Sequence, residues 1–256
     1  MAIFVFTHIP CYSQILSGSL VIILRTESEI IVGSDGRGVG TGLLDFNSPI
    51  CKINELDSLT LFAQTGEAVI DSFDVLAIAE SSHALGKNLT ASFQIFDSTI
   101  NKRLLEIAQL KSVSATAYFR SHLANKQPIH AAFMGAQNNT LTFIVAAYCV
   151  AVDTFGNIST YSKVVRRPSD TENDGSYITI GNDTLTKLIL SKNPDIFRTL
   201  GPSKAIEKLV SAESIYSPDK VSDTVYIAWL NGSGIRWIGN PPPCIKPHRK
   251  SIEGKY

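Results

Sequence analysis

Cysteine and histidine are scarce in this sequence, and neither is arranged as a set of metal ligands. The four cysteines (Cys11, Cys51, Cys149 and Cys244) are widely scattered and form no closely spaced pair. The five histidines form no HExxH or similar cluster. Zinc sites usually draw their ligands from such short spacings. We therefore expect no metal site, no cofactor and no disulfide framework.

An excess of charge of one sign is also absent, as are long apolar runs. The 256 residues include 23 basic and 23 acidic side chains, so no global field favours nucleic acid or an anionic membrane. No apolar run approaches the roughly 18 to 20 residues that span a bilayer. We expect a soluble mature protein that binds neither nucleic acid nor membrane.

The two ends of the chain differ from its middle. Residues 1–18 start with an apolar stretch but lack a positive n-region, and Pro10 interrupts any longer hydrophobic segment. This pattern favours a propeptide over a signal peptide as the leader. Asn240-Pro241-Pro242-Pro243 cannot continue a central strand, so residues 240–256 are predicted to be an extended C-terminal tail. Residues 19–239 are the one predicted domain.

Hydrophobic periodicity predicts strands and helices in alternating groups across residues 19–239. The strand-like runs are 20–24, 30–33, 50–53, 59–63, 130–134, 141–152, 158–163, 176–180, 224–230 and 235–238. The first helical pattern begins at Gly66 and ends near Gly86 and Asn88. Further helical patterns cover 93–123, 185–190 and 202–212. This order predicts an α+β protein in which two sheets face each other and helix pairs cover their outer faces, a four-layer αββα sandwich.

Residues 18–37 are the most informative segment. The runs 20–24 and 30–33 flank the polar Thr26-Glu27-Ser28-Glu29, so an antiparallel hairpin brings Ser19 beside Asp35. In the next apolar run, Lys52 occupies a position whose two neighbours point to the opposite face. A hydroxyl, a carboxylate and an amine can therefore converge at one end of this hairpin.

A cut at the Gly18–Ser19 bond would make Ser19 the first residue. Its α-amine, with an ordinary pKa of about 7.7 to 8.0, could then take the hydroxyl proton near neutral pH. Gly18 suits such a bond because it places no side chain beside the attacked carbonyl. The same three residues also have structural interpretations. Ser19 fits the start of an edge strand, Asp35 fits a turn position, and Lys52 fits the solvated face of a strand.

Two segments near the start of the domain resemble the proteasome family of N-terminal-nucleophile hydrolases, which includes proteasome β subunits and bacterial proteasome-like proteases. Ser19 matches the nucleophilic threonine of active subunits. The spacing continues without a gap to Ser34-Asp35-Gly36-Arg37, which is similar to the family's Ala-Asp-Ser-Arg. Cys51-Lys52-Ile53 matches the strand that bears the catalytic lysine.

Two later segments extend the resemblance, which runs from Ser19 to about residue 238. Leu61-Phe62-Ala63-Gln64-Thr65-Gly66-Glu67-Ala68 is similar to the family segment in which a strand ends in glycine before the first long helix. Gly66 matches the oxyanion donor in that segment. Asp219-Lys220-Val221-Ser222-Asp223-Thr224 resembles the family's Asp-x-x-Ser-Gly-Gly, so Asp219 and Ser222 match its supporting polar pair.

The resemblance implies the proteasome-type four-layer αββα fold and a self-processing amide hydrolase that acts on a peptide or protein. The catalytic set that it implies is Ser19, Asp35, Lys52, Gly66, Asp219 and Ser222. It also implies a homo-oligomer, with ring assembly and an ATP-driven unfoldase as family features, and a cytoplasmic location. If residues 1–18 are a signal peptide, the protein is instead exported.

The chain departs from the family pattern at three places. Ser19 replaces the usual threonine, Asn182 stands where active members have the serine of Gly-Ser-Gly, and Asp223-Thr224 replaces Gly-Gly. The last two departures favour a second interpretation, a catalytically inactive proteasome-like protein with a structural or assembly role. A third is an exported amidase for a small amide, uncovered when signal peptidase cuts after Gly18.

Overall fold

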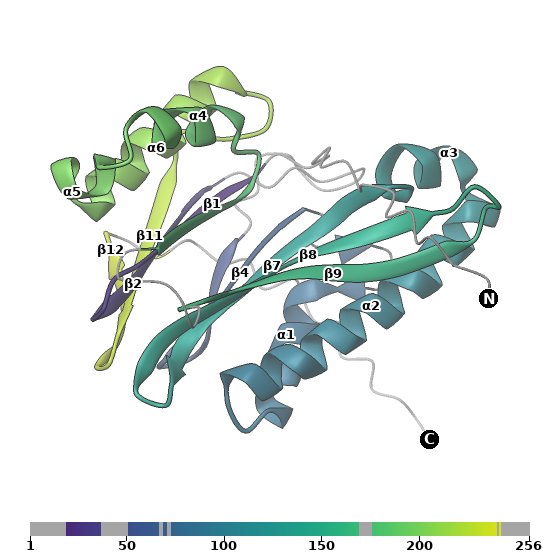
Figure 1. Ribbon diagram of the computed structural model, residues 1–256, viewed down its shortest axis with the longest axis horizontal. Helices are drawn as coiled ribbons and strands as arrows, with labels where there is room; N and C mark the ends of the chain where they lie inside the picture. Colours follow the sequence, from purple (N-terminus) through teal and green to yellow (C-terminus); the bar gives the residue numbers. More distant parts are fainter. Residues whose placement is uncertain are drawn as a thin grey trace, which may run out of the picture.

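A computed structural model of the protein describes residues 19–36, 51–66, 69–70, 73–168, 176–239 and 241 (Figure 1). The predicted leader lies outside the described residues, and so does the predicted tail apart from residue 241. Within the described part, 38% of the residues are helical and 41% are in strands. The protein is therefore mixed in secondary structure, and its strands form two five-stranded antiparallel sheets and a small ribbon.

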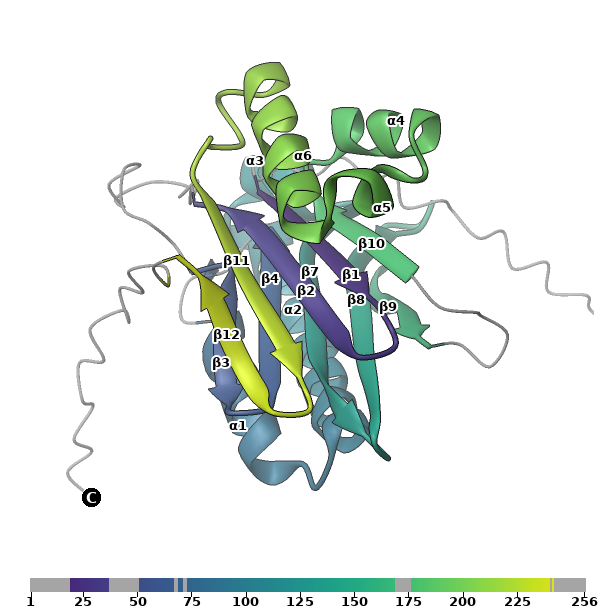
Figure 2. The ribbon, with the colours of Figure 1, turned by 90° about the vertical axis from the view of Figure 1, so that its left-hand side faces the viewer.

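The first sheet contains the predicted hairpin. Its strands lie in the order β10-β1-β2-β11-β12, and each pairs antiparallel with its neighbours (Figure 2). The bounds are Leu20–Arg25 (β1), Glu29–Asp35 (β2), Ser176–Gly181 (β10), Val225–Asn231 (β11) and Gly234–Ile238 (β12). Every residue of β1 is buried, which explains why its sequence shows a continuous apolar run rather than alternation.

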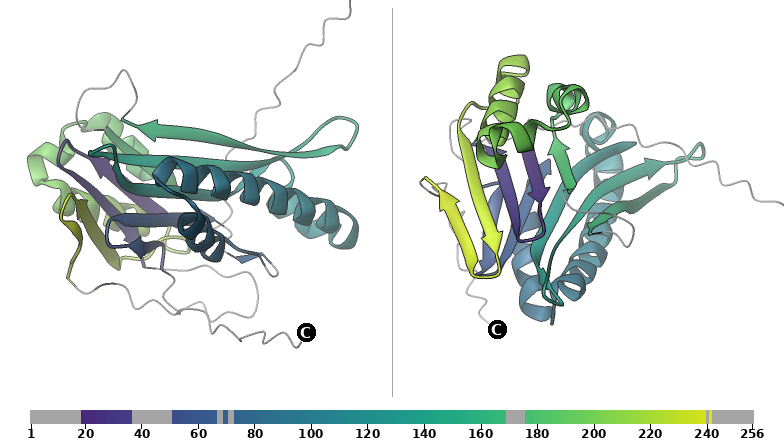
Figure 3. Two further views of the ribbon diagram at one scale, coloured as in Figure 1. Left: turned by 90° about the horizontal axis from the view of Figure 1, so that it is seen from below. Right: turned by 60° about the vertical axis from the view of Figure 1, so that its left-hand side comes forward.

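The second sheet has the strand order β3-β4-β7-β8-β9. The bounds are Ile53–Asp57 (β3), Thr60–Gly66 (β4), Lys126–Gln137 (β7), Thr140–Val152 (β8) and Ile158–Arg167 (β9). A two-stranded ribbon, β5 (Val69–Ile70) and β6 (Phe73–Asp74), follows β4. Strands β8 and β9, with 13 and 10 residues, are much longer than β1, with 6. Their hairpin consequently projects beyond the first sheet (Figure 3).

Helices pack on both sheets. The helices α1 (Val75–Leu85) and α2 (Leu89–Ser114) lie against the second sheet, followed by the short α3 (Thr116–Tyr118) and the π-helical η1 (Phe119–Leu123). The helices α4 (Thr184–Lys192), α5 (Ile196–Leu200) and α6 (Pro202–Tyr216) lie against the first sheet. Side-chain caps fix two helix starts, because Asp74 accepts from the Leu76 and Ala77 amides and Asn88 accepts from the Ala91 amide.

Three apolar clusters hold these elements together. One lies between the two sheets and includes Val21, Ile23, Leu61, Ala63 and Met134. A second joins the second sheet to α1 and α2, and its aromatic side chains meet edge to face. The third joins the first sheet to α4, α5 and α6. Neighbouring residues of one strand enter different clusters, so the buried strands contribute to two cores at once.

The predicted four-layer αββα sandwich of the proteasome type is wrong. The described residues form two antiparallel sheets and six α-helices in a mixed arrangement that is not a clear stack of four layers. The apolar cluster between the sheets takes side chains from β1, β2, β10 and β11 on one side and from β3, β4, β7 and β8 on the other, while the far part of the β8–β9 hairpin extends past it. Periodicity indicates which faces of a strand are buried, but it does not fix how far one sheet overlaps another.

Two predicted element boundaries are also wrong. The helical pattern assigned from Gly66 does not begin there, because Gly66 ends β4 and the helix starts at Val75 under the Asp74 cap. The third strand begins at Ile53 rather than residue 50, so Lys52 precedes the strand. At the helix the Asp74 cap sets the start, and apolar spacing alone overlooks such a cap.

Replacing Phe96 with alanine should destabilise the protein by about 3 to 5 kcal/mol, because the ring is fully buried and its removal leaves a cavity. The ring centroids of Phe62, Phe133 and Tyr148 lie 5.5, 5.1 and 6.0 Å from that of Phe96. Phe155, which is 89% exposed, is the matched control and should change stability by less than about 0.5 kcal/mol. Urea unfolding measures both, and equal losses would contradict this account of the core.

Candidate functional site

The start of β1 and the end of β2 lie side by side, as the hairpin interpretation expects. Val21 pairs with Ser34, and the Leu20 amide donates to the Asp35 carboxylate over 2.7 Å. Ser19, only 6% exposed, directly precedes this contact. The carboxylate of Asp35 is therefore held against the backbone next to Ser19.

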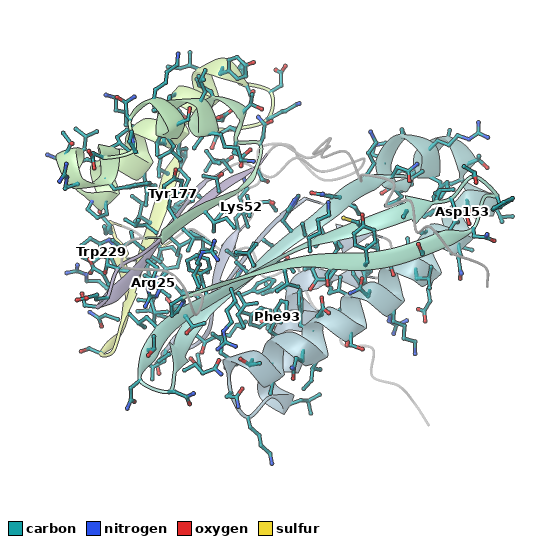
Figure 4. All side chains as sticks on the ribbon, viewed as in Figure 1. Arg25, Lys52, Phe93, Asp153, Tyr177 and Trp229 are labelled. Atoms are coloured by element: carbon teal, nitrogen blue, oxygen red, sulfur yellow. The ribbon has the colours of Figure 1, made fainter. Side chains whose placement is uncertain are left out.

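Lys52 completes a buried ion pair with Asp35. Its Nζ lies 2.5 Å from Asp35 Oδ1, and the two side chains are 3% and 0% exposed. The Lys52 carbonyl accepts from the Gln64 amide over 2.9 Å, which ties this segment to β4. Figure 4 places Lys52 between the two sheets, toward the opposite end of β1 from Arg25. Because desolvated charges are costly, such a pair needs the further hydrogen bonds that Asp35 receives.

Ser222 supplies one of those hydrogen bonds, whereas Asp219 does not. The Ser222 amide donates to Asp35 Oδ2 over 3.2 Å, and the Ser222 hydroxyl accepts from the Gly36 amide over 3.0 Å. Asp219 lies exposed in the turn after α6, and no hydrogen bond within the described residues joins it to the ion pair. The structure thus brings Ser19, Asp35, Lys52 and Ser222 to one end of the sheets, here called the nucleophile end.

Two glycines shape the nucleophile end. Gly66 has a φ of +96°, and a Cβ there would meet the Pro128 carbonyl oxygen at 2.1 Å. Gly181 has a φ of +97°, and a Cβ there would meet the Ser19 carbonyl oxygen at 1.9 Å. The same Ser19 carbonyl accepts from the Asn182 amide over 2.5 Å. Only glycine fits both positions, and Gly181 allows the backbone of β10 to hold Ser19.

Sequence reasoning missed two polar side chains near the nucleophile end, Thr65 and His130. They face each other in the β4–β7 register and are 4% and 6% exposed. Burial, followed by the positive charge of Lys187, lowers the pKa of His130 from 6.5 to about 4. The signal in the sequence is a histidine at a position that alternates with Ala132 and Met134, which both belong to the core between the sheets.

The expectation of no disulfide framework is wrong at Cys51. This residue, which adjoins Lys52, is disulfide-bonded, while Cys149 is a buried free thiol. Scattered cysteines show no pairing motif in a sequence, because the fold rather than local spacing brings such residues together.

Within the described ranges, no group of three or more histidine, cysteine or acidic side chains could hold a metal ion. No helix in the described part of the chain has the length and apolar content to cross a membrane. No protein-family model matches the chain, and no curated protein matches it.

Replacing Gly181 with alanine should destabilise the protein by about 2 kcal/mol more than the same change at Gly156. Both glycines have positive φ, but a Cβ on Gly156 would meet nothing within 4 Å, whereas one on Gly181 would collide with Ser19. Thermal and urea unfolding of the two variants give the difference. Equal losses would show that β10 does not constrain Ser19.

Stability should fall as the pH is lowered from about 6.5 to about 4. In this window the unfolded chain binds a proton at His130 that the folded protein excludes, since the folded pKa is depressed. The lost free energy of unfolding is about 3 kcal/mol. Urea unfolding of H130Q should show a shallower pH slope than the wild-type protein, with H122Q as the control. An unchanged slope in H130Q would contradict the assignment.

Proposed function

We propose that the protein is a self-processing N-terminal-nucleophile amide hydrolase that uses Ser19 and cleaves a peptide or protein. The observation that carries the proposal is the buried Lys52–Asp35 pair, which sits against the backbone that follows Ser19. A cation fixed at this place favours an ionised hydroxyl and an unprotonated amine nearby. Both effects activate a serine as a nucleophile.

Self-processing comes first in this mechanism. The Ser19 hydroxyl attacks the Gly18 carbonyl, the bond from that carbonyl to the Ser19 nitrogen breaks, and water hydrolyses the resulting ester. The Ser19 nitrogen thereby becomes a free α-amine, while residues 1–18 leave with a carboxylate. Positioning of the Ser19 carbonyl by Gly181 and Asn182 supports this step, because it restricts the backbone around the attacking residue.

Peptide hydrolysis then repeats the chemistry on a substrate. The α-amine takes the hydroxyl proton as the oxygen attacks the carbonyl carbon, and gives that proton to the departing amine. Water then hydrolyses the acyl ester on Ser19, which releases the second product as a carboxylate and restores the Ser19 hydroxyl. Gly66 is the proposed backbone donor to the oxyanion, an interaction worth on the order of 3 kcal/mol in comparable sites. In this scheme Ser222 holds Asp35 by a hydrogen bond, and Asp219 supports the site without contacting the ion pair. The family resemblance adds a homo-oligomer and an ATP-driven unfoldase as proposed partners.

The second candidate is a non-catalytic protein with a structural or assembly role. Two observations favour it. Asn182 supplies a carboxamide where an active site of this type has a hydroxyl, and Asp219 is exposed rather than joined to the ion pair. In this alternative the Lys52–Asp35 pair only stabilises the junction of the two sheets.

The test is the intact mass and N-terminal sequence of the purified protein, wild type against S19A. The hydrolase predicts a wild-type chain that starts at Ser19 and an S19A chain that keeps its leader. It also predicts labelling of Ser19 by an electrophilic peptide and a fall in peptide hydrolysis of about a thousandfold or more in S19A. Ser233, which also follows a glycine, gives the matched control S233A, and this variant should behave as wild type.

The other outcomes separate the candidates. An intact leader and no labelling in either protein would support the structural role. Loss of the leader from both wild type and S19A would identify an external processing protease. Peptide hydrolysis that survives in S19A would exclude Ser19 as the nucleophile.

A further inference from the structure

Three polar side chains at the nucleophile end, two buried and one half-buried, have a buried polar atom with no partner. They are Thr65, His130 and Asn182, here called the polar triplet, and the atoms are Thr65 Oγ1, His130 Nδ1 and Asn182 Nδ2. None of the three atoms has a hydrogen-bond partner within the described part of the protein. Buried polar groups are nearly always hydrogen-bonded, so these three atoms require a polar partner, which is either a ligand or water.

The triplet belongs to one place in the fold, beside Ser19. Thr65 and His130 are direct cross-strand partners, and their strands direct them toward the first sheet, as Ala63 and Met134 show. The Thr65 methyl group lies 3.3 Å from the point where a Cβ on Gly181 would sit. Asn182 follows Gly181, and its amide holds the Ser19 carbonyl.

Whether each of the three atoms donates or accepts a hydrogen bond follows from its chemical group and, for His130, from a neighbouring contact. His130 Nε2 lies 3.3 Å from the Gln127 side-chain oxygen, and the tautomer that satisfies this contact has its proton on Nε2 and an acceptor at Nδ1. The imidazole stays neutral because its burial and the nearby Lys187 both disfavour a second proton. Asn182 Nδ2 is a donor, and the Thr65 hydroxyl can donate or accept.

We propose that the polar triplet is a substrate subsite that binds a primary carboxamide, the group at the end of an asparagine or glutamine side chain. The carboxamide nitrogen donates to His130 Nδ1, and its oxygen accepts from Asn182 Nδ2 and the Thr65 hydroxyl. A carboxylate would bring a lone pair against Nδ1, and an ammonium would find no carboxylate in the triplet. An apolar group would leave all three polar atoms unpaired. The carboxamide is a substrate group only if the protein is the proposed hydrolase, so this inference rests on the proposed function.

The test measures binding, so that it does not depend on turnover. The full chain carrying S19A and ¹⁵N-labelled histidine is titrated with three N-acetyl amino-acid N-methylamides of similar shape, those of asparagine, aspartate and leucine. The His130 imidazole signals are assigned by their absence in H130Q. We expect a saturable shift of Nδ1 with the asparagine compound and an affinity at least about tenfold higher than for the other two.

Two threonine variants on this background complete the experiment. T65V removes the hydroxyl without changing the shape and should lower the asparagine preference on the order of tenfold. T142V, at a buried threonine in the distant part of β8, should keep the preference. Equal affinity for the three compounds, an unshifted Nδ1, or a T65V protein with full preference would overturn the subsite.

Failure of the subsite and failure of the proposed hydrolase give different results. Ser19-dependent maturation without an asparagine preference removes only the subsite. An asparagine-selective shift at His130 in a protein that never loses its leader supports a carboxamide-binding site and removes only the hydrolase.

Discussion

The buried ion pair between Asp35 and Lys52 is the interaction on which the organisation of the nucleophile end depends. Asp35 lies at the end of β2, in the first sheet, and Lys52 lies just before β3, in the second. The pair therefore joins the two sheets as well as two side chains. Its carboxylate also receives the Leu20 and Ser222 amides, which come from the start of β1 and the segment before β11. Three other segments of the chain thus converge on the Asp35 carboxylate.

Such a convergence is hard to build for stability alone. Replacing a buried ion pair with apolar side chains of similar volume is often neutral or stabilising. Stability alone therefore does not explain why charged side chains occupy this position. A fixed cation next to a serine is one such reason, since it changes the proton affinity of the groups around it. The same logic applies to the polar triplet, where neutral hydrogen-bonding groups occupy a region that the inter-sheet core would otherwise fill with apolar side chains.

The sequence predicts local features of this protein much better than its assembly. The hairpin of β1 and β2, and with it the position of Asp35, follows from two apolar runs around a polar turn. The position of Ser222 was inferred from a resemblance, and the structure places it on Asp35. The overlap of the sheets could not be predicted, because it depends on strand lengths that extend beyond the shared core. His130 could not be identified either, since a single polar residue in an apolar strand reveals its surroundings only after the sheets are packed.

The unequal length of the sheets has a consequence for how two copies of this protein could meet along a sheet edge. The β8–β9 hairpin projects past the first sheet, and β9 is the edge strand, so its outer backbone groups offer a template for strand addition. The exposed side chains of β9 include Lys163 and Arg166. Two copies that met edge to edge would bring these cations together without a compensating carboxylate on the same strand. Charge repulsion along β9 therefore opposes the pairing of two copies through this edge.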